Sequence, residues 1–198
     1  MFKISLTKEM IISEQHVTNE NNKYKHMKKL FNILFLSTLG LNAQDAKDYS
    51  KQVVTLDSTI ETLYSVISGD KGVERDWDLF KHLFHKDAKL IPTGNNKEGK
   101  TMARYMSPDD YIDSSGKWLF ENGFHEIELN RQTQTFGDIT QVFSTYESFR
   151  RKEDTEPFMR GINSIQLMND GERWWIINIY WMQESEKNPL PKAYLPKN

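Results

Sequence analysis

Two apolar segments near the carboxyl end of the chain constrain the fold more than any other feature. Residues 160–168 and 174–181 are rich in β-branched and aromatic side chains, and Asn169-Asp170-Gly171 separates them. An Asp-Gly pair between two such runs is a strong signal for a β-hairpin. The carboxyl-terminal part of the chain is therefore predicted to be antiparallel sheet.

The segments immediately before this hairpin have the same character. Residues 124–136 and 139–151 alternate apolar with polar side chains, and Gly137-Asp138 lies between them. With residues 160–168 and 174–183, they predict a meander of four long antiparallel strands. Such a sheet twists strongly and tends to curl.

The part of the chain before the meander is predicted to be helical. Apolar residues at helical spacing predict helices over residues 56–67, 75–84 and 107–122, with a short strand over residues 88–92. Ser107 is expected to cap the third helix, with Asp110 as its partner. Helices grouped before an antiparallel sheet predict an α+β fold. We expect three N-terminal helices packed on a strongly curved, mostly antiparallel sheet that forms a cone with a pocket.

The amino-terminal part of the chain has the pattern of an export signal. Met27-Lys28-Lys29 precedes an apolar run over residues 30–41, and the small residue Ala43 follows. We expect residues 27–43 to be a signal peptide cleaved near Ala43, and residues 1–26 to be a disordered, non-native upstream extension. The protein would then be periplasmic or secreted. The alternative is an amphipathic helix, although the apolar run is unbroken rather than periodic.

The remaining length suits one domain. Of the 198 residues, 44–55 are expected to form a polar leader, 56–184 a single domain and 185–198 an extended tail. No segment after the signal is apolar enough to predict a membrane span.

Composition argues against several classes of function. The chain has 26 basic and 28 acidic residues without a basic stripe, so nucleic-acid binding has little electrostatic support. It has no cysteine, which excludes thiol catalysis and Cys-ligated zinc. No glycine-rich phosphate loop is present, and we expect no cofactor. Asp78, His82 and His85 have a spacing that a metal site can use, but the pattern is weak and we expect no metal.

Several segments together resemble one known superfamily. The resemblance is carried by residues 75–80, 83–84, 88–92, 142–147, 160–164 and 173–177, together with Trp181. In these segments, and from residue 56 to 184 as a whole, the chain resembles an exported bacterial member of the nuclear transport factor 2-like superfamily. This group includes ketosteroid isomerases, scytalone dehydratases and SnoaL-like cyclases. The resemblance implies the cone fold and a homodimer formed through the sheet face. It implies no single activity, because one fold hosts many functions.

Strand alternation gives a separate route to the pocket residues. In the first long strand, Ile127 and Leu129 define an apolar face that His125 and Arg131 share. In the second, the face with Val142 and Tyr146 is favoured as the inner one. In the third, Asn163 shares the face of Ile165 and Leu167. In the last strand, Trp175, Ile177, Ile179 and Trp181 are expected inside, with Ile176 and Tyr180 outside.

Five of these or nearby residues are candidates for a site. His125 is the acid–base candidate, or else a histidine at the rim of the sheet. Tyr146 is a hydrogen-bond donor to a developing oxyanion, or an aromatic residue of the core. Asn163 orients a ligand carbonyl, or is a buried amide. Trp77 and Trp181 line or floor the cone, or only pack in it.

Three functions remain open. The first is a module that holds a small apolar or amphipathic ligand in the cone. The second is a cofactor-free isomerase, dehydratase or cyclase acting on a carbonyl compound, with His125 as base. The third is a protein–protein interaction module that uses the sheet face, where an apolar surface containing Ile176 and Tyr180 is expected.

Overall fold

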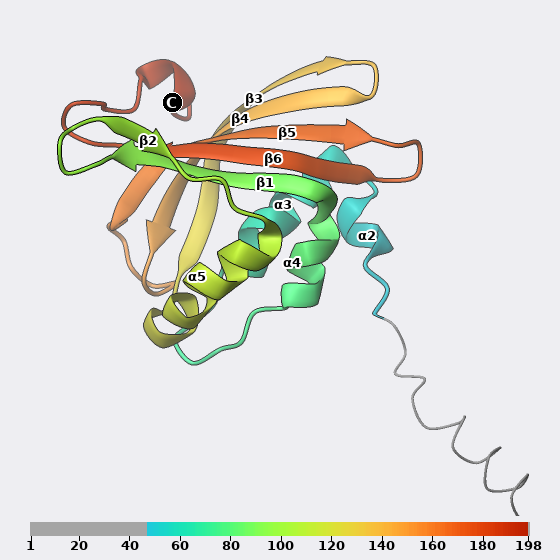
Figure 1. The fold of residues 1–198 in the computed structure, drawn as a ribbon, viewed down its shortest axis with the longest axis horizontal. Helices are drawn as coiled ribbons and strands as arrows, with labels where there is room; N and C mark the ends of the chain where they lie inside the picture. Colours follow the sequence, from blue (N-terminus) through green and yellow to red (C-terminus); the bar gives the residue numbers. More distant parts are fainter. Residues whose placement is uncertain (1–46, 198) are drawn as a thin grey trace, which may run out of the picture. The chain divides into compact units, whose positions relative to one another are not determined.

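The computed structural model describes residues 47–197, and these form a curved sheet with helices on one side (Figure 1). The predicted extension at residues 1–26, and the predicted signal peptide at residues 27–43 with its cleavage point at Ala43, lie outside the described residues. Within residues 47–197, no helix is long and apolar enough to cross a membrane.

The helices and strands follow one another in an order close to the prediction. They are α2 (Ser50–Val53), α3 (Leu56–Ile67), α4 (Trp77–Leu83), β1 (Phe84–Asn95), β2 (Thr101–Ala103), α5 (Pro108–Asn122), β3 (His125–Phe136), β4 (Ile139–Phe149), β5 (Met159–Asn169), β6 (Trp174–Gln183) and the 3-10 helix η1 (Lys192–Tyr194).

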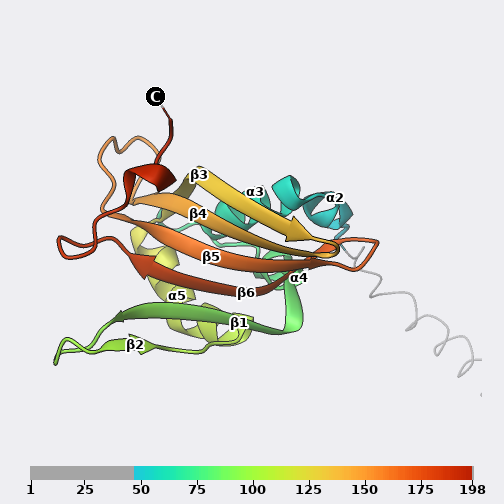
Figure 2. The same ribbon diagram turned by 90° about the horizontal axis from the view of Figure 1, so that it is seen from above.

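The six strands form one sheet in the order β2-β1-β6-β5-β4-β3. Neighbouring strands are antiparallel, except that β1 runs parallel to β6. Figures 1 and 2 show the sheet bending around α3, α4 and α5, which cover its concave face. The mixed α+β architecture and the four-stranded meander are therefore as predicted.

The helices differ from the prediction in number. Four α-helices, not three, lie within residues 47–197, because α2 forms in the segment predicted to be a polar leader. Val53 of α2 is only 2% exposed and belongs to the core, which explains why this short helix is ordered. Helix α5 begins as predicted, with reciprocal hydrogen bonds between Ser107 and Asp110.

Strand β1 is longer than predicted. It begins at Phe84 rather than at residue 88, and its pairing with β6 shifts register between Phe84 and Lys89. This irregularity interrupts the apolar alternation at His85, Lys86 and Asp87, so the sequence pattern did not indicate a strand there. Strand β2 was not predicted, and it pairs with the end of β1.

Two β-bulges interrupt the alternation predicted for β3 and β6, so the predicted inner face is wrong on the amino-terminal side of each bulge, while Ile179 and Trp181 lie inside as predicted. The β3–β4 register shifts between Glu128 and Asn130, and Ile127 is 47% exposed instead of buried. The β5–β6 register shifts at Ile177, and Ile176, predicted outside, is fully buried in the core. A bulge inserts one residue and moves the side chains beyond it to the opposite face. The predicted outer surface therefore keeps Tyr180 and loses Ile176.

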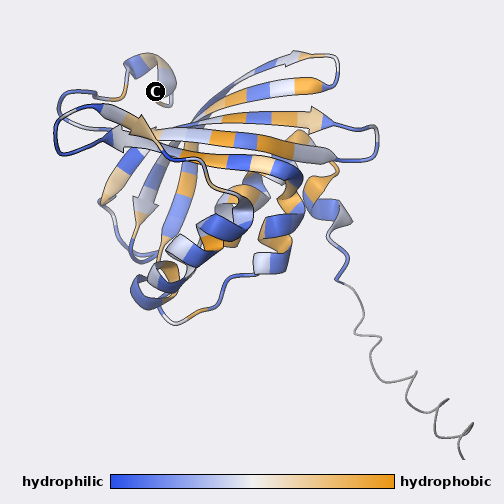
Figure 3. Ribbon diagram, in the orientation of Figure 1, coloured by the Kyte–Doolittle hydropathy of each residue, from blue (hydrophilic) through white to orange (hydrophobic). Residues whose placement is uncertain are grey.

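The core lies between the helices and the concave face of the sheet. Apolar and polar residues alternate along the strands (Figure 3), as expected where one face is buried. Arg75, 7% exposed, connects α3 with α5, because it donates hydrogen bonds to the carbonyl oxygens of Ile67 at the end of α3, of Gly69 just beyond it and of Leu119 in α5. These bonds fix the position of α5, which forms one wall of the site described next.

The carboxyl-terminal segment was predicted to be extended, but it contains the 3-10 helix η1. The Tyr194 carbonyl oxygen accepts hydrogen bonds from Thr145 Oγ1 at 2.7 Å and Asn130 Nδ2 at 3.3 Å. The Tyr194 ring contacts Phe143 with a centroid separation of 5.0 Å. The tail thus packs on the outer face of β3 and β4.

Candidate functional site

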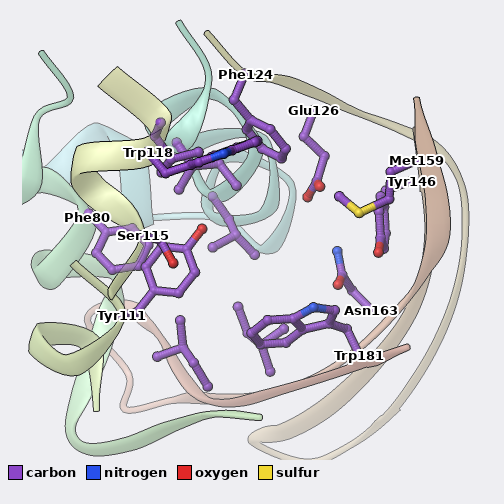
Figure 4. A pocket seen from close by; sticks show the side chains of 15 residues that line it. Phe80, Tyr111, Ser115, Trp118, Phe124, Glu126, Tyr146, Met159, Asn163 and Trp181 are labelled. Carbon is purple, nitrogen blue, oxygen red and sulfur yellow. The ribbon is translucent and has the colours of Figure 1, made fainter. Parts of the chain in front are cut away.

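A pocket of about 220 Å³ lies between the helices and the concave face of the sheet (Figure 4). Its walls come from α3, α4, α5 and from strands β1, β3, β4, β5 and β6. The lining side chains are Leu63, Ile67, Phe80, Leu90, Tyr111, Ser115, Trp118, Leu119, Phe124, Glu126, Tyr146, Met159, Asn163, Ile179 and Trp181. Most of this surface is aromatic or aliphatic, which is typical of small-molecule sites.

Glu126 is the only acidic side chain in this lining. It lies on β3, and Figure 4 shows its carboxyl group directed into the pocket. Burial raises the pKa of Glu126 from 4.5 to about 7, although hydrogen bonds from Ser148 and Asn163 act to lower it. The Ser148 hydroxyl donates to Glu126 Oε2 at 2.9 Å. A carboxyl group with this pKa changes charge near neutral pH and is suited to acid–base chemistry.

Tyr146 on β4 lies beside Glu126 in the lining. Its side chain is 1% exposed, and no group in residues 47–197 forms a hydrogen bond with its hydroxyl. Buried tyrosine hydroxyls usually have a partner. Burial raises the pKa of Tyr146, so the hydroxyl stays protonated and offers a donor to whatever occupies the pocket.

Asn163 on β5 completes this polar end of the pocket. It is 7% exposed, and its Nδ2 donates to the Tyr64 hydroxyl at 3.1 Å. Figure 4 shows the Asn163 amide and the Tyr146 hydroxyl close together on the same side of the cavity as Glu126. Three strands thus bring an acid, a hydroxyl and an amide to one end of an apolar pocket.

The opposite wall is formed by α5. Tyr111 stacks on Phe80 with a centroid separation of 5.3 Å, and Ser115 lies one turn further along the helix. Trp118 follows, 40% exposed, with the Arg150 guanidinium 4.5 Å from its ring centroid. An exposed indole that also lines the pocket places Trp118 at the rim.

The structure brings three of the five predicted site residues together. Tyr146, Asn163 and Trp181 all line the pocket. His125 does not, because the side chains of β3 alternate and Glu126 takes the inner position. Instead His125 Nε2 lies 2.8 Å from Asp70 Oδ1, outside this lining. Trp77 is also outside, since its ring packs edge-on against Phe80 and beneath Gly116 of α5.

Glu126 is the residue that sequence reasoning missed. The face of β3 was assigned from Ile127, whose side chain proved to be exposed. The spacing Glu126, Glu128, with Arg131 after the bulge, was the available signal, because these charged residues share the inner side of β3. Charged side chains on the buried, concave face of a sheet need hydrogen-bond or ion-pair partners. Their presence there indicates a functional site rather than a solvent-exposed strand edge.

The structure does not bring Asp78, His82 and His85 together as a metal site. His82 is on α4 and receives a hydrogen bond from Arg173, with 2.8 Å between Arg173 Nη1 and His82 Nε2. His85 is on β1 and its ring contacts Trp175. No group of three potential metal ligands occurs within residues 47–197.

Comparison with known proteins identifies the fold. A scan against family models and a search of curated proteins gave no match. Among solved structures, a cystatin-like protein of unknown function from Nostoc punctiforme is 11% identical, with a TM-score of 0.50 over 66% of this chain and 90% of that one. A proposed scytalone dehydratase from Novosphingobium aromaticivorans is 12% identical, with a TM-score of 0.50 over 66% and 82% of the two chains.

An NTF2-like protein of unknown function from Silicibacter pomeroyi is 17% identical over 65% of this chain and 92% of that one, with a TM-score of 0.45. The chain has the nuclear transport factor 2-like fold, as the resemblance in its sequence predicted. At these identities the comparisons concern the fold alone and assign no activity.

Proposed function

We propose that this protein binds a small, mainly apolar molecule with one hydrogen-bond-accepting group, such as a carbonyl, in the pocket. The observation that carries the proposal is the buried Tyr146 hydroxyl, which lines the cavity and has no hydrogen-bond partner among residues 47–197. A cavity of about 150 Å³ holds benzene. A cavity of about 220 Å³ therefore suits a substituted single ring.

The lining also indicates the charge of the ligand. None of the residues lining the pocket is basic, and Glu126 is the one acidic residue. An anionic group would lie beside a carboxyl group without a counter-ion, which is unfavourable in an apolar site. The proposed ligand is therefore neutral, with its acceptor beside Tyr146 and its apolar part against Trp118 and Trp181.

A pair of matched probes tests this proposal. Acetophenone has a ring and a carbonyl, and ethylbenzene has the same ring without the acceptor. We expect acetophenone to bind more tightly, with NMR shifts at the Trp181 indole. The Tyr146→Phe variant should bind acetophenone about tenfold more weakly and ethylbenzene unchanged. If neither probe binds, the proposal of a ligand pocket is refuted. If the native chain binds both probes equally, the proposed hydrogen bond from the polar end of the pocket is refuted.

A second candidate is favoured by the raised pKa of Glu126. An unprotonated Glu126 is a suitable base for a proton next to a carbonyl, and Tyr146 is placed to donate to the oxygen that becomes negative. The proton would move from the ligand carbon to a Glu126 oxygen while the electron pair moves toward the carbonyl oxygen. This chemistry is shared by the isomerases, dehydratases and cyclases considered above, with Glu126 in the role first expected for His125.

Deuterium exchange tests this second candidate with the same probe. Acetophenone deuterated on its methyl group should exchange deuterium for solvent hydrogen faster with the protein at pH 8 than without it. Glu126→Gln should reduce the protein-dependent rate by about a hundredfold or more. A rate that is the same in the native chain and in Glu126→Gln would contradict proton transfer and leave only binding.

Export of the protein, and its pairing as a homodimer through the sheet face, remain predictions. Tyr180 is 47% exposed on β6, whereas η1 covers part of the outer face at β3 and β4. A second copy would therefore meet the sheet on the side of β6 and β1. Sedimentation of the full chain at several concentrations would show whether it pairs.

A further inference from the structure

A line of buried polar groups extends from the pocket toward the surface between α3 and the sheet. Asn163 Nδ2 is 3.1 Å from the Tyr64 hydroxyl, which is 2.6 Å from Ser144 Oγ. Ser144 Oγ is in turn 2.5 Å from Glu128 Oε1. Asn163, Tyr64 and Ser144 are 7%, 5% and 0% exposed. We call Asn163, Tyr64, Ser144 and Glu128 the relay.

The outer end of the relay is ionised. Arg131 contacts Glu128 Oε2 through Nε and Nη2, each at 2.9 Å. Arg131 Nη1 also lies 2.9 Å from Asp57 Oδ1 of α3. A carboxylate that forms such an ion pair with an arginine accepts hydrogen bonds and has no proton to donate.

This charge dictates the direction of every bond in the relay. Because Glu128 can only accept, Ser144 must donate to it, and the single Ser144 proton is then used. Tyr64 must therefore donate to Ser144, which leaves its oxygen to accept. Burial raises the pKa of Tyr64, so its hydroxyl retains the proton that this arrangement requires. Asn163 must then present its NH₂ group, and not its carbonyl oxygen, to Tyr64.

Figure 4 shows the amide nitrogen of Asn163 on the side that faces the Glu126 carboxyl group, and Asn163 acts to lower the pKa of Glu126. The other groups around Glu126 are the Ser148 hydroxyl and the phenols of Tyr64 on α3, Tyr111 on α5 and Tyr146 on β4. Of these groups, Tyr111, Tyr146 and Asn163 line the pocket, and Asn163 is the one whose orientation the relay sets. An amide turned the other way would direct its oxygen toward Glu126 and would favour the protonated acid.

We propose that Glu128 is a positioning residue for this site, which acts through Ser144 and Tyr64 to hold the Asn163 amide with its N–H toward Glu126. The ionised Glu126 is thereby stabilised by a group that lies outside the pocket lining. The inference rests on the proposed function in that Glu126 belongs to the same pocket, but it concerns the ligand-free protein.

Two variants and a matched control test the inference. Glu128→Gln replaces an obligate acceptor by an amide that can also donate, so the direction of the relay is no longer fixed. Tyr64→Phe removes the acceptor of Asn163 without changing charge. Asp57→Asn removes a carboxylate from the same ion-pair group but leaves the relay intact. The measurement is the titration midpoint of Glu126 in the full chain, from carboxyl-carbon NMR, with the signal identified by its loss in Glu126→Gln.

The sign of the change is decisive. Loss of an ordered donor should raise the Glu126 midpoint by about one pH unit in both Glu128→Gln and Tyr64→Phe, and Asp57→Asn should change it much less. If Glu128 acted on Glu126 only through its negative charge, and not through the relay, Glu128→Gln would lower the Glu126 midpoint. A fall or no change in Glu128→Gln would overturn the inference. If Glu128→Gln does not fold, Tyr64→Phe decides by the same criterion.

The two proposals fail in different ways. A Glu126 midpoint near 4.5 in the native chain would remove the basis for proton transfer, whatever the variants show. A midpoint near 7 that does not rise in the variants would refute the relay and leave the proposed function intact.

Discussion

Glu126 shows how a single side chain links the chemistry of the pocket to the stability of the protein. In the unfolded chain its pKa is near 4.5, whereas burial in the folded protein raises it to about 7. Between these two values the folded state binds more protons than the unfolded state. The free energy of unfolding therefore falls as pH rises through this interval. The stabilising contribution of protonated Glu126 is complete only below about pH 4.5.

We predict that Glu126→Gln removes this pH dependence. As pH rises from 4.5 to 8, the unfolding free energy of the native chain should fall by up to about 3 kcal/mol relative to that of the variant, because glutamine cannot ionise. Urea unfolding of both proteins at pH 4.5, 6 and 8 measures the difference. A difference that does not vary with pH would mean that Glu126 is not protonated in the folded protein near neutrality.

At the scale of the strands, the register between β4 and β5 places Gly161 directly opposite Tyr146. A Cβ atom at Gly161 would lie 2.6 Å from the Tyr146 hydroxyl oxygen and 2.5 Å from the Met182 carbonyl oxygen. Only glycine leaves room for the tyrosine ring to lie across the neighbouring strand. The position of the unpartnered hydroxyl thus depends on the absence of a side chain on β5.

Gly161→Ala should therefore affect both stability and binding. We expect it to lower the unfolding free energy by about 2 kcal/mol through overpacking and to weaken acetophenone binding by displacing the Tyr146 hydroxyl. Gly94→Ala on β1 is the control, because nothing lies within 4 Å of the Cβ position there. Thermal unfolding and probe titration of the two variants measure these effects, and equal behaviour of both would contradict the role given to Gly161.

The strands also show why sequence patterns failed at particular positions. Alternation along β4 and β5 correctly placed Tyr146 and Asn163 inside, because those two strands pair with each other without interruption. Alternation failed on the amino-terminal side of the bulges in β3 and β6, at Ile127 and Ile176, whereas Ile179 and Trp181 beyond the β6 bulge line the pocket as predicted. Bulges depend on the partner strand, and no residue type marks them in a single sequence.

At the scale of the whole molecule, the two faces of the sheet have different roles. The concave face and the helices enclose the pocket, and the outer face supports η1 through Thr145 and Phe143. Tyr180 remains exposed on that outer face. The site is thus separated from the surface proposed for pairing, and an interaction through the sheet face and a ligand in the pocket are compatible functions.

The sequence by itself determined the order of the three longer helices and of the four meander strands, the α+β class and the resemblance to the nuclear transport factor 2-like fold. Local signals carry that information: the hairpin at Asp170-Gly171, the cap at Ser107 and the periodicity of apolar residues. Only the tertiary structure decided that Glu126 rather than His125 enters the pocket, and that the Tyr146 hydroxyl has no hydrogen-bond partner in the described part of the chain. It also decided that Glu128 reaches Asn163 through Tyr64 and Ser144. These facts depend on strand bulges and on contacts between residues up to 99 positions apart, and local patterns do not encode such contacts.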